Sequence, residues 1–455
     1  MTTRGPVVRY RARRVLPIPR EPFADGVVAV ADGRIIYVGP PGGGPMGDEV
    51  NLGDVALLPG LVNVHTHLEL TAFRGLLEDL PFQRWISTLT RARRAVMTSE
   101  SMLDAARLGV AEGLIAGITT YADTSESGIV VDALSAGGVR GIVFQEVFGP
   151  DPAQRERSLA ELQRKVGALR ERQSPLVRVG VSPHAVYSVS EALFTATCDW
   201  AADERLPVAI HAAESEDEDR FVVDGTGLFA DALRARHIEV RALGVSPLAY
   251  LERAGALRPH TLLIHCVRAD RDDVERVRQA GCAVAHCPAS NAKLGHGVAP
   301  VLAFLGAGVR VGLGSDSVAS NNRMDILGEA RLAVLTQRAE RRDHGVLTAG
   351  RALSLATLEG AAALGLDAEI GSLDVGKQAD LAAFPLQDAG GGEELDVEAA
   401  LVHAVAGRSA RFVCVAGVPR VRDSRLVDED GGLLGRVRET TRGLARWREA
   451  LGGAR

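Results

Sequence analysis

The chain has 455 residues, a net charge of −6, 46% hydrophobic residues and 24% charged residues. This length allows a large core beside a smaller accessory domain, and the mild negative charge excludes a strongly basic nucleic-acid or membrane-surface binder. No apolar run approaches the roughly 20 residues of a membrane span, and the five cysteines form no C-x-x-C pair, so we expect a cytoplasmic protein without disulfides.

The two flanks of the chain have the character of short strands and turns. Residues 1–58 contain GVVAVADGRIIYVGP, two alternating apolar segments around an Asp-Gly pair, which is typical of a β-hairpin. Residues 368–424 again contain short strands and glycine turns, and the last stretch has the one-sided apolar spacing of a surface helix. We expect residues 1–58 and 368–455 to fold together as a small β-sandwich domain that also carries the C-terminal helix.

Between the flanks, short apolar runs alternate with Ala-, Leu- and Arg-rich stretches that have helical spacing. Eight of the runs are hydrophobic enough to be buried on both faces, as parallel strands are. In chain order they are LPGLVNVHTH, ITTYADT, VRGIVFQEV, VRVGVSPHA, PVAIHAAE, TLLIHCV, CAVAHCP and RVGLGSDS. Eight such units predict an α/β fold in which residues 59–367 form a (β/α)₈ TIM barrel.

Polar residues stand at the C-terminal end of every predicted strand. A single buried histidine is often satisfied by a backbone carbonyl, but a whole ring of buried polar groups needs a shared partner. Barrel enzymes carry their active sites on this face. The residues are His65, His67, Asp123, Glu146, His184, His211, His265, His286 and Asp316.

Four of these residues have the chemistry of a metal site. His65 and His67 are two apart on one strand, so their side chains point to the same face. His211 adds a third imidazole, and Asp316 adds a carboxylate. Such a set suits Zn²⁺, with Fe²⁺ as the alternative, and leaves a position for a bound water.

Several motifs resemble the amidohydrolase superfamily in order and spacing, in its metal-dependent deaminase branch. They are PGLVNVHTH, HAAE, HCPASNAKLGHGVAP and GLGSDSVAS, and the resemblance covers nearly the whole chain. Methylthioadenosine/S-adenosylhomocysteine deaminases belong to this branch. The stretches HTHLEL, HAAESEDEDRFVVDGTG and LEDLPFQRWI are most similar to the aminodeoxyfutalosine deaminase group.

The resemblance implies hydrolytic removal, as ammonia, of the 6-amino group of an adenosine-type nucleoside. The first candidate substrate is 6-amino-6-deoxyfutalosine of menaquinone biosynthesis, and the second is methylthioadenosine or S-adenosylhomocysteine. Guanine deaminase and s-triazine hydrolase activities rank lower. A non-catalytic scaffold is disfavoured because the metal ligands are all present. A homodimer is left open.

The lysines bear on the number of metals. Two-metal amidohydrolases usually bridge their metals with a carboxylated lysine on a barrel strand. The chain contains only Lys165, Lys293 and Lys377, none of them in a predicted barrel strand. We therefore expect one metal per chain.

The resemblance also implies catalytic roles. Glu214, three residues after His211, would take a proton from water and pass it to the ring nitrogen and the leaving amine. His265 is expected to hydrogen-bond the attacking oxygen or the tetrahedral centre, and Asp316 to accept a proton as well as bind metal.

Substrate contacts are expected from five further residues. His184 resembles the family's substrate-side histidine, Trp85 would stack on the base or cap the pocket, and Glu69 would orient the metal ligands or touch substrate hydroxyls. Arg74 and Arg84, in the loop after the first barrel strand, would bind a carboxylate. The remaining residues considered are assigned no catalytic role: His286 and Asn291 order a turn, and His237, His260, His296, His344 and His403 are ordinary.

Overall fold

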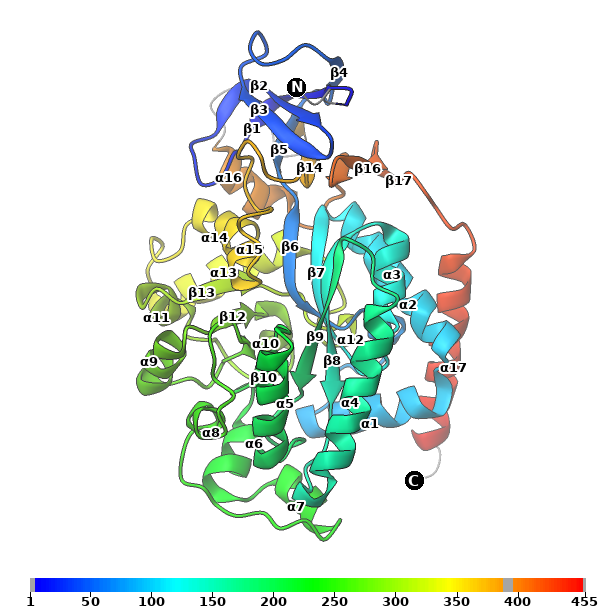
Figure 1. The fold of residues 1–455 in the computed structure, drawn as a ribbon, viewed down its shortest axis with the longest axis vertical. Helices are drawn as coiled ribbons and strands as arrows, with labels where there is room; N and C mark the ends of the chain where they lie inside the picture. Colours follow the sequence, from blue (N-terminus) through cyan, green and yellow to red (C-terminus); the bar gives the residue numbers. More distant parts are fainter. Residues whose placement is uncertain (1–4, 388–395, 453–455) are drawn as a thin grey trace.

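The computed structural model describes residues 5–387 and 396–452. Strands from both flanks form a single nine-stranded sheet in the order β17-β16-β15-β14-β5-β1-β2-β3, with β4 added on β1. This sheet lies at one end of the molecule, at the top of Figure 1. Its strands are β1 (Val8–Val15), β2 (Phe23–Ala31), β3 (Arg34–Gly39), β4 (Asp48–Asn51), β5 (Val55–Pro59), β14 (Leu381–Pro385), β15 (Phe412–Val415), β16 (Val418–Arg422) and β17 (Arg425–Leu426).

The predicted Asp-Gly hairpin is confirmed in this sheet. β2 and β3 pair antiparallel, and the turn residues Asp32 and Gly33 have φ values of 52° and 73°. A tight hairpin turn requires positive φ at both central residues, which an Asp-Gly pair tolerates. β5 pairs antiparallel with β14, so the two flanks of the chain are joined in one sheet.

The eight predicted strand segments each contain one strand, and these strands form two four-stranded parallel sheets. Isolated parallel bridges connect the segments at the sheet edges: Thr66 with Asp316, Val181 with Val208, and Ala185 with His211. The strands are β6 (Leu61–Thr66), β7 (Ile118–Ser125), β8 (Arg140–Val147), β9 (Val177–Pro183), β10 (Ala209–Ala212), β11 (Leu262–His265), β12 (Ala283–His286) and β13 (Arg310–Leu313).

Helices surround the parallel strands (Figure 1), and all residues of β6, β7 and β8 are buried. The helices of this part are α1 (Phe82–Val96), α2 (Ser99–Ile115), α3 (Val130–Gly137), α4 (Arg155–Arg170), α5 (Glu191–Asp203), α6 (Glu216–Asp219), α7 (Leu228–Arg234), α8 (Pro247–Arg253), α9 (Arg271–Ala280), α10 (Pro288–Lys293), α11 (Val301–Gly306), α12 (Val318–Asn321), α13 (Ile326–Arg341), α14 (Ala349–Leu355) and α15 (Leu358–Ala363). Shorter turns are 3₁₀ at Leu68–Phe73 and Pro152–Gln154 and π at Arg220–Asp224.

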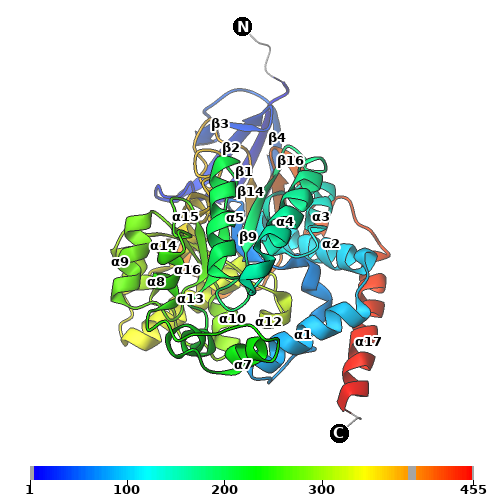
Figure 2. The same ribbon diagram turned by 60° about the horizontal axis from the view of Figure 1, so that its bottom comes forward.

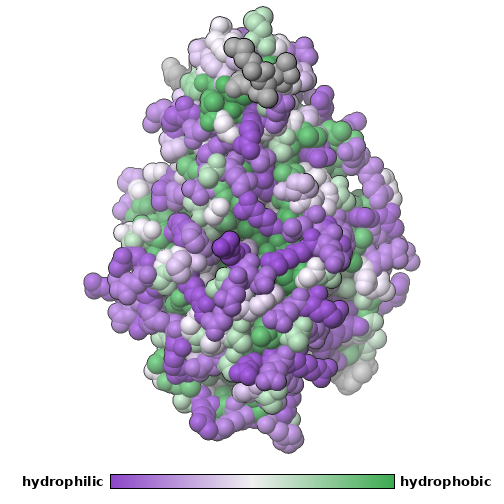
Figure 3. Space-filling view, in the orientation of Figure 1, coloured by the Kyte–Doolittle hydropathy of each residue, from purple (hydrophilic) through white to green (hydrophobic). Residues whose placement is uncertain are grey.

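The end of the molecule opposite the terminal sheet carries α1 and α7, and it comes forward in Figure 2. Within the described ranges, no helix is both long and apolar enough to cross a membrane. The face drawn in Figure 3 is predominantly hydrophilic, with scattered apolar residues.

The C-terminal segment contributes α16 (Val397–Ala400), a π turn (Leu401–Val405) and the long helix α17 (Leu433–Gly452). α17 runs beside α1 and α2 (Figures 1 and 2) and buries Leu444 in an apolar cluster with Trp85. The Thr441 hydroxyl donates to the carbonyl of Ala72 at 2.9 Å. The one-sided packing predicted for this helix is therefore made against the segment that follows β6.

Candidate active site

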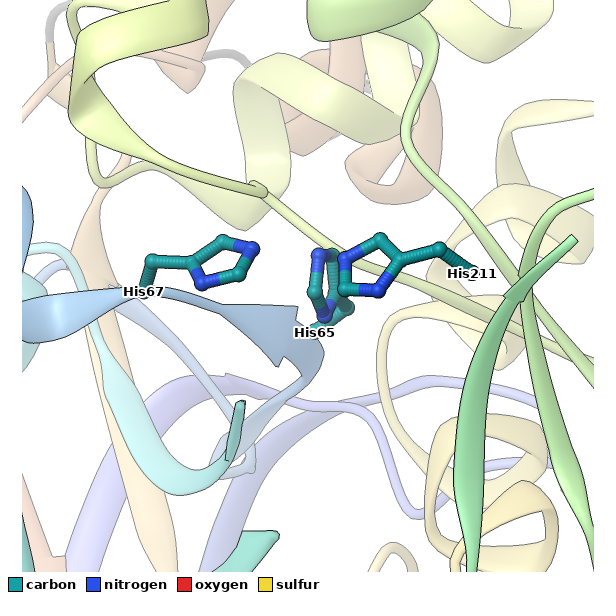
Figure 4. A group of neighbouring side chains, drawn as sticks. All are labelled: His65, His67 and His211. Carbon is teal, nitrogen blue, oxygen red and sulfur yellow. The ribbon is translucent and has the colours of Figure 1, made fainter. Parts of the chain in front are cut away.

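The C-terminal ends of the parallel strands bring the four predicted metal ligands together. Nε2 of His65 lies 3.2 Å from Oδ1 of Asp316, and Nε2 of His67 lies 3.6 Å from the same oxygen. His65, His67 and His211 each offer a ring nitrogen within 4.8 Å of the others. Figure 4 shows the three imidazoles converging from the end of β6 and from β10.

The protonation states of this group suit a cation. Burial lowers the pKa of His65 to about 4 and also lowers the pKa values of His67 and His211, so the imidazoles are neutral and their lone pairs are free to bind. Burial alone would raise the pKa of Asp316, but His65 and the other histidines hold it well below its usual range. Three neutral imidazoles around one carboxylate fit a divalent metal.

Asp316 is held in place by its surroundings. Its second oxygen, Oδ2, accepts hydrogen bonds from the hydroxyls of Ser290 at 2.5 Å and Ser320 at 2.9 Å, which leaves Oδ1 facing the histidines. Its backbone is in the left-handed region, with φ of 56°, and its N–H donates to the carbonyl of His65. Residues other than glycine adopt this conformation at some cost, so the surrounding contacts must hold the backbone of Asp316 in place.

His65, His67, His211 and Asp316 are called the metal-type cluster below. Glu214 lies beside this cluster and between two further histidines. Its Oε1 is 3.6 Å from Nε2 of His265 and 3.5 Å from Nε2 of His296. Burial would raise the pKa of Glu214, but these two histidines outweigh it and lower the pKa. The backbone N–H groups of Ala213 and Glu214 donate to the buried carboxyl of Glu218 at 2.9 and 2.7 Å, so the segment that presents Glu214 is fixed.

The sequence predicts no catalytic role for His296 and predicts only that Asn291 orders a turn. The structure places His296 against Glu214, and it places the Asn291 side-chain oxygen 3.0 Å from Nδ1 of His265. This contact orients His265 so that its Nε2 points toward Glu214. The signal was present in the motif HCPASNAKLGHGVAP, which contains both residues, but neither stands at a strand end.

A cavity of about 480 Å³ opens over these groups. His67, His211, His265, Asp316 and Glu214 line its inner part. One face of α1 forms a wall, through Phe82, Trp85, Ile86, Leu89, Thr90, Arg93 and Arg94, and α4 contributes Ser158, Glu161, Leu162 and Lys165. The cavity is large enough for a small-molecule substrate.

Three of the predicted substrate contacts line this cavity: Glu69, Trp85 and His184. Oε2 of Glu69 accepts from the Ser125 hydroxyl at 2.8 Å, and its Oε1 lies 3.1 Å from the Arg93 guanidinium, so its carboxylate is engaged by the protein. The His184 ring lies 4.8 Å from that of His211. Trp85 stacks beside Phe82.

The two predicted carboxylate-binding arginines are not brought to the cavity. Arg74 forms an ion pair with Glu112, with Nη1 2.8 Å from Oε1, and lines a separate surface hollow. Arg84 lies on α1 but is absent from the cavity lining. Arg84 was expected in a loop but lies on helix α1, and which face of a helix borders a cavity depends on how the helix packs.

Three other cations line the cavity in their place. Arg93 pairs with Glu69 and with Glu126, and Nζ of Lys165 lies 3.3 Å from Glu161. Arg94 lines the cavity and has no ion pair or hydrogen bond among the described residues. It is therefore the cation whose charge is least compensated there.

Glu146 is a buried carboxyl group at the end of β8. It lines the cavity, its Oε1 has no hydrogen-bond partner within the described structure, and it lies 4.0 Å from Nε2 of His184. Burial raises the pKa of Glu146 from 4.5 to about 8. At neutral pH this group is therefore mainly uncharged.

None of the three lysines lies on a parallel strand, as predicted. Lys165 is in α4 and Lys293 in α10, where its Nζ is 2.9 Å from Glu78. Lys377 precedes β14 and donates to the carbonyl of Ile370. The structure therefore offers no lysine that could bridge two metals at the strand ends.

Comparison with known proteins places this site in a family. The sequence matches the amidohydrolase family over residues 56–418. It is 33% identical over 415 residues to a 5-methylthioadenosine/S-adenosylhomocysteine deaminase of Moorella thermoacetica. The aligned region covers 89% of this chain and 91% of the relative.

Two solved structures are also similar. A zinc-bound adenosine deaminase from Xanthomonas campestris superposes with a TM-score of 0.86 at 30% identity, over 96% of this chain and 98% of the other. The aminofutalosine deaminase of Helicobacter pylori, solved with methylthio-coformycin, has a TM-score of 0.79 at 22% identity over 90% of this chain and 99% of the other, so it shares the fold. The chain belongs to the amidohydrolase family and is a hydrolase of carbon–nitrogen bonds.

Proposed function

We propose that this protein is a metal-dependent deaminase that hydrolyses the 6-amino group of an adenosine-type nucleoside to ammonia. The observation that carries the proposal is the placement of Glu214 and His265 beside the His65–His67–His211–Asp316 group, at the inner end of the cavity. The names of the relatives support the same reaction class.

The proposed metal is one Zn²⁺ per chain, with Fe²⁺ as the alternative, held by His65, His67, His211 and Asp316. A divalent ion bound there would lower the pKa of water and supply a nucleophile at neutral pH. The fit rests on neutral imidazoles, an ionised carboxylate and the absence of a strand lysine in the described chain. The zinc named in the Xanthomonas structure is in keeping with this choice.

The protein groups then divide the proton transfers. Glu214 takes one proton of the attacking water and delivers it to the purine ring nitrogen beside C6, where it stays in the product; it then relays the second proton to the leaving amine, so that ammonia departs. His265, oriented by Asn291, hydrogen-bonds the oxygen that adds to C6. Asp316, whose Oδ1 faces the cluster, accepts the second proton of the water.

We also propose that the two parallel sheets are halves of a (β/α)₈ barrel that spans residues 59–367, and that residues 1–58 and 368–455 form a β-sandwich domain that also carries the C-terminal helix. The bridges Thr66–Asp316, Val181–Val208 and Ala185–His211 support closure of the barrel, because they connect both pairs of sheet edges. The rings of Tyr10 and Phe412, 4.8 Å apart, support the sandwich, since their strands are not neighbours in the terminal sheet.

Our first candidate substrate is 6-amino-6-deoxyfutalosine, which would place the enzyme in menaquinone biosynthesis. This nucleoside carries a carboxyphenyl group at the end opposite the 6-amino group. The cavity offers apolar side chains for the ring, in Ile86, Leu89 and Phe148, and offers Arg94 and Lys165 for the carboxylate. The second candidate is methylthioadenosine or S-adenosylhomocysteine, which is favoured by the name of the Moorella relative.

The test is a substrate panel with ammonia detection. Purified, metal-loaded enzyme is given aminodeoxyfutalosine, methylthioadenosine, S-adenosylhomocysteine, adenosine and guanine. We expect release of ammonia from 6-aminopurine nucleosides, with kcat/KM for aminodeoxyfutalosine at least about tenfold above that for methylthioadenosine. Equal or better turnover of methylthioadenosine moves the assignment to the second candidate, and no release from any nucleoside refutes the reaction class.

A further inference from the structure

His296 lies in the loop that follows α10 and is buried against the proposed proton carrier. Its side chain is 4% exposed, and its Nε2 is 3.5 Å from Oε1 of Glu214. The same oxygen lies 3.6 Å from Nε2 of His265. One oxygen of the Glu214 carboxylate is therefore placed between two imidazoles.

The loop is built to turn this side chain inward. His296 stands between Gly295 and Gly297, whose φ values are 73° and 108°, and its N–H donates to the carbonyl of Asn291 at 2.9 Å. A side chain at either glycine would be strained in this conformation. The chain can therefore reverse on both sides of the histidine and direct its ring into the protein.

Phe82 covers the other side of the histidine. The two rings are 4.6 Å apart and perpendicular, and Phe82 lines the cavity whereas His296 does not. An apolar ring between the imidazole and the cavity covers the His296 side of the contact with Glu214. It also separates His296 from the substrate, so a direct role in substrate binding is not indicated.

We infer that His296 is a positioning residue, which holds one oxygen of the Glu214 carboxylate and leaves the other oxygen directed to the reacting atoms. The inference rests on the proposed function of Glu214. The 3.5 Å separation is long for a charge-assisted hydrogen bond, and such contacts often shorten only when substrate is bound. A buried contact of this kind restricts the carboxylate to one orientation, which is where proton transfer gains its rate.

Two substitutions separate the polar contact with Glu214 from the packing of the His296 ring. His296→Leu fills much of the same space without a donor, whereas His296→Gln keeps an N–H that can reach Glu214. We expect the leucine variant to lose about 10- to 100-fold in kcat, with KM within about twofold and metal content unchanged. The glutamine variant should recover most of that loss. His344→Leu, which replaces an exposed histidine, serves as the control and should match the wild type.

A second measurement does not depend on the substrate. Crystal structures of the metal-loaded wild type and His296→Leu should show the Glu214 carboxylate rotated away from its wild-type orientation in the variant. The inference is overturned by an unmoved carboxylate, by kcat of the leucine variant within twofold of wild type, by a glutamine variant no better than leucine, or by a loss expressed in KM. If the wild type deaminates no nucleoside, the proposed reaction fails, and the two structures still decide whether His296 positions Glu214.

Discussion

The inner and outer parts of the cavity are built from different kinds of chain. The inner part is formed by strand ends, where His65 and His67 point the same way because side chains alternate along a strand. The outer part is formed by α1 and α4, and there the side chains find partners that depend on tertiary packing: Arg93 of α1, for example, turns to Glu69. The register of a strand fixes which side its side chains face, whereas the side chains of a helix face the cavity only if the helix packs with that side inward.

The two parts also differ in charge. At the strand ends, the pKa shifts favour neutral imidazoles beside an ionised Asp316. Glu146, at the end of β8, is also held mainly uncharged, whereas in the outer part Arg93 and Lys165 are paired with acids. The inner part is therefore suited to one defined reaction, and the outer part can vary with the substrate. The following changes test that division, beginning with the largest expected effect.

Removal of an inner ligand should abolish both metal binding and turnover. For His67→Ala we expect loss of the proposed metal and a fall in activity on the order of 10³ or more, because that metal would supply the nucleophile. Circular dichroism should remain close to that of the wild type, since the site lies on the catalytic face of the strands. Elemental analysis should find one metal per wild-type chain, and two tightly held metals would contradict the proposed centre.

Glu214→Gln should separate chemistry from binding. The amide keeps the size of the carboxyl group but does not carry a proton, so we expect kcat to fall by about 10²–10⁴. Metal content and nucleoside affinity, measured by equilibrium binding, should be retained. A kcat within a few-fold of wild type would show that the proton is carried by another group.

In the outer part, Arg94→Gln should affect only substrates with a distal carboxylate. We expect kcat/KM for aminodeoxyfutalosine to fall about tenfold, roughly 1.4 kcal/mol, with little change for methylthioadenosine. Arg84→Gln, on the same helix but outside the cavity lining, is the matched control. A larger effect from Arg84 than from Arg94 would return the carboxylate site to the residue predicted from sequence.

The smallest effect concerns the pH dependence of stability at Glu146. Its pKa rises to about 8 in the folded protein because of burial, so the folded state retains a proton that the unfolded state has released. Stability is therefore lost between about pH 4.5 and pH 8 as pH rises. Glu146→Gln has no carboxyl group to titrate, so its stability should not fall in this way. The Tm of the variant minus the Tm of the wild type should therefore be about 2–4 °C larger at pH 9 than at pH 5. A pH-independent difference in Tm would rule out this role of burial.

The strands and the metal-type cluster could be predicted because both follow from a pattern within short segments: an apolar run that ends in polar residues. Each of the eight buried runs contains a strand, and the polar residues that close those runs include His65, His211 and Asp316. The Asp-Gly pair likewise defined its hairpin. His296 could not be found in this way, since its role depends on a loop that returns to Glu214 from 82 positions later in the chain. The cations of the outer cavity lie on α1 and α4, and which faces of these helices border the cavity is set by tertiary packing.

The contact between α17 and the segment around α1 has a consequence for the order in which the protein is made. Arg91 of α1 lies over the Trp447 ring of α17, although more than 350 positions separate them in the sequence. During synthesis, the strand ends can assemble while the wall formed by α1 still lacks its support. The wall formed by α1 can therefore gain this contact only after the strands that carry the histidine cluster have been synthesised.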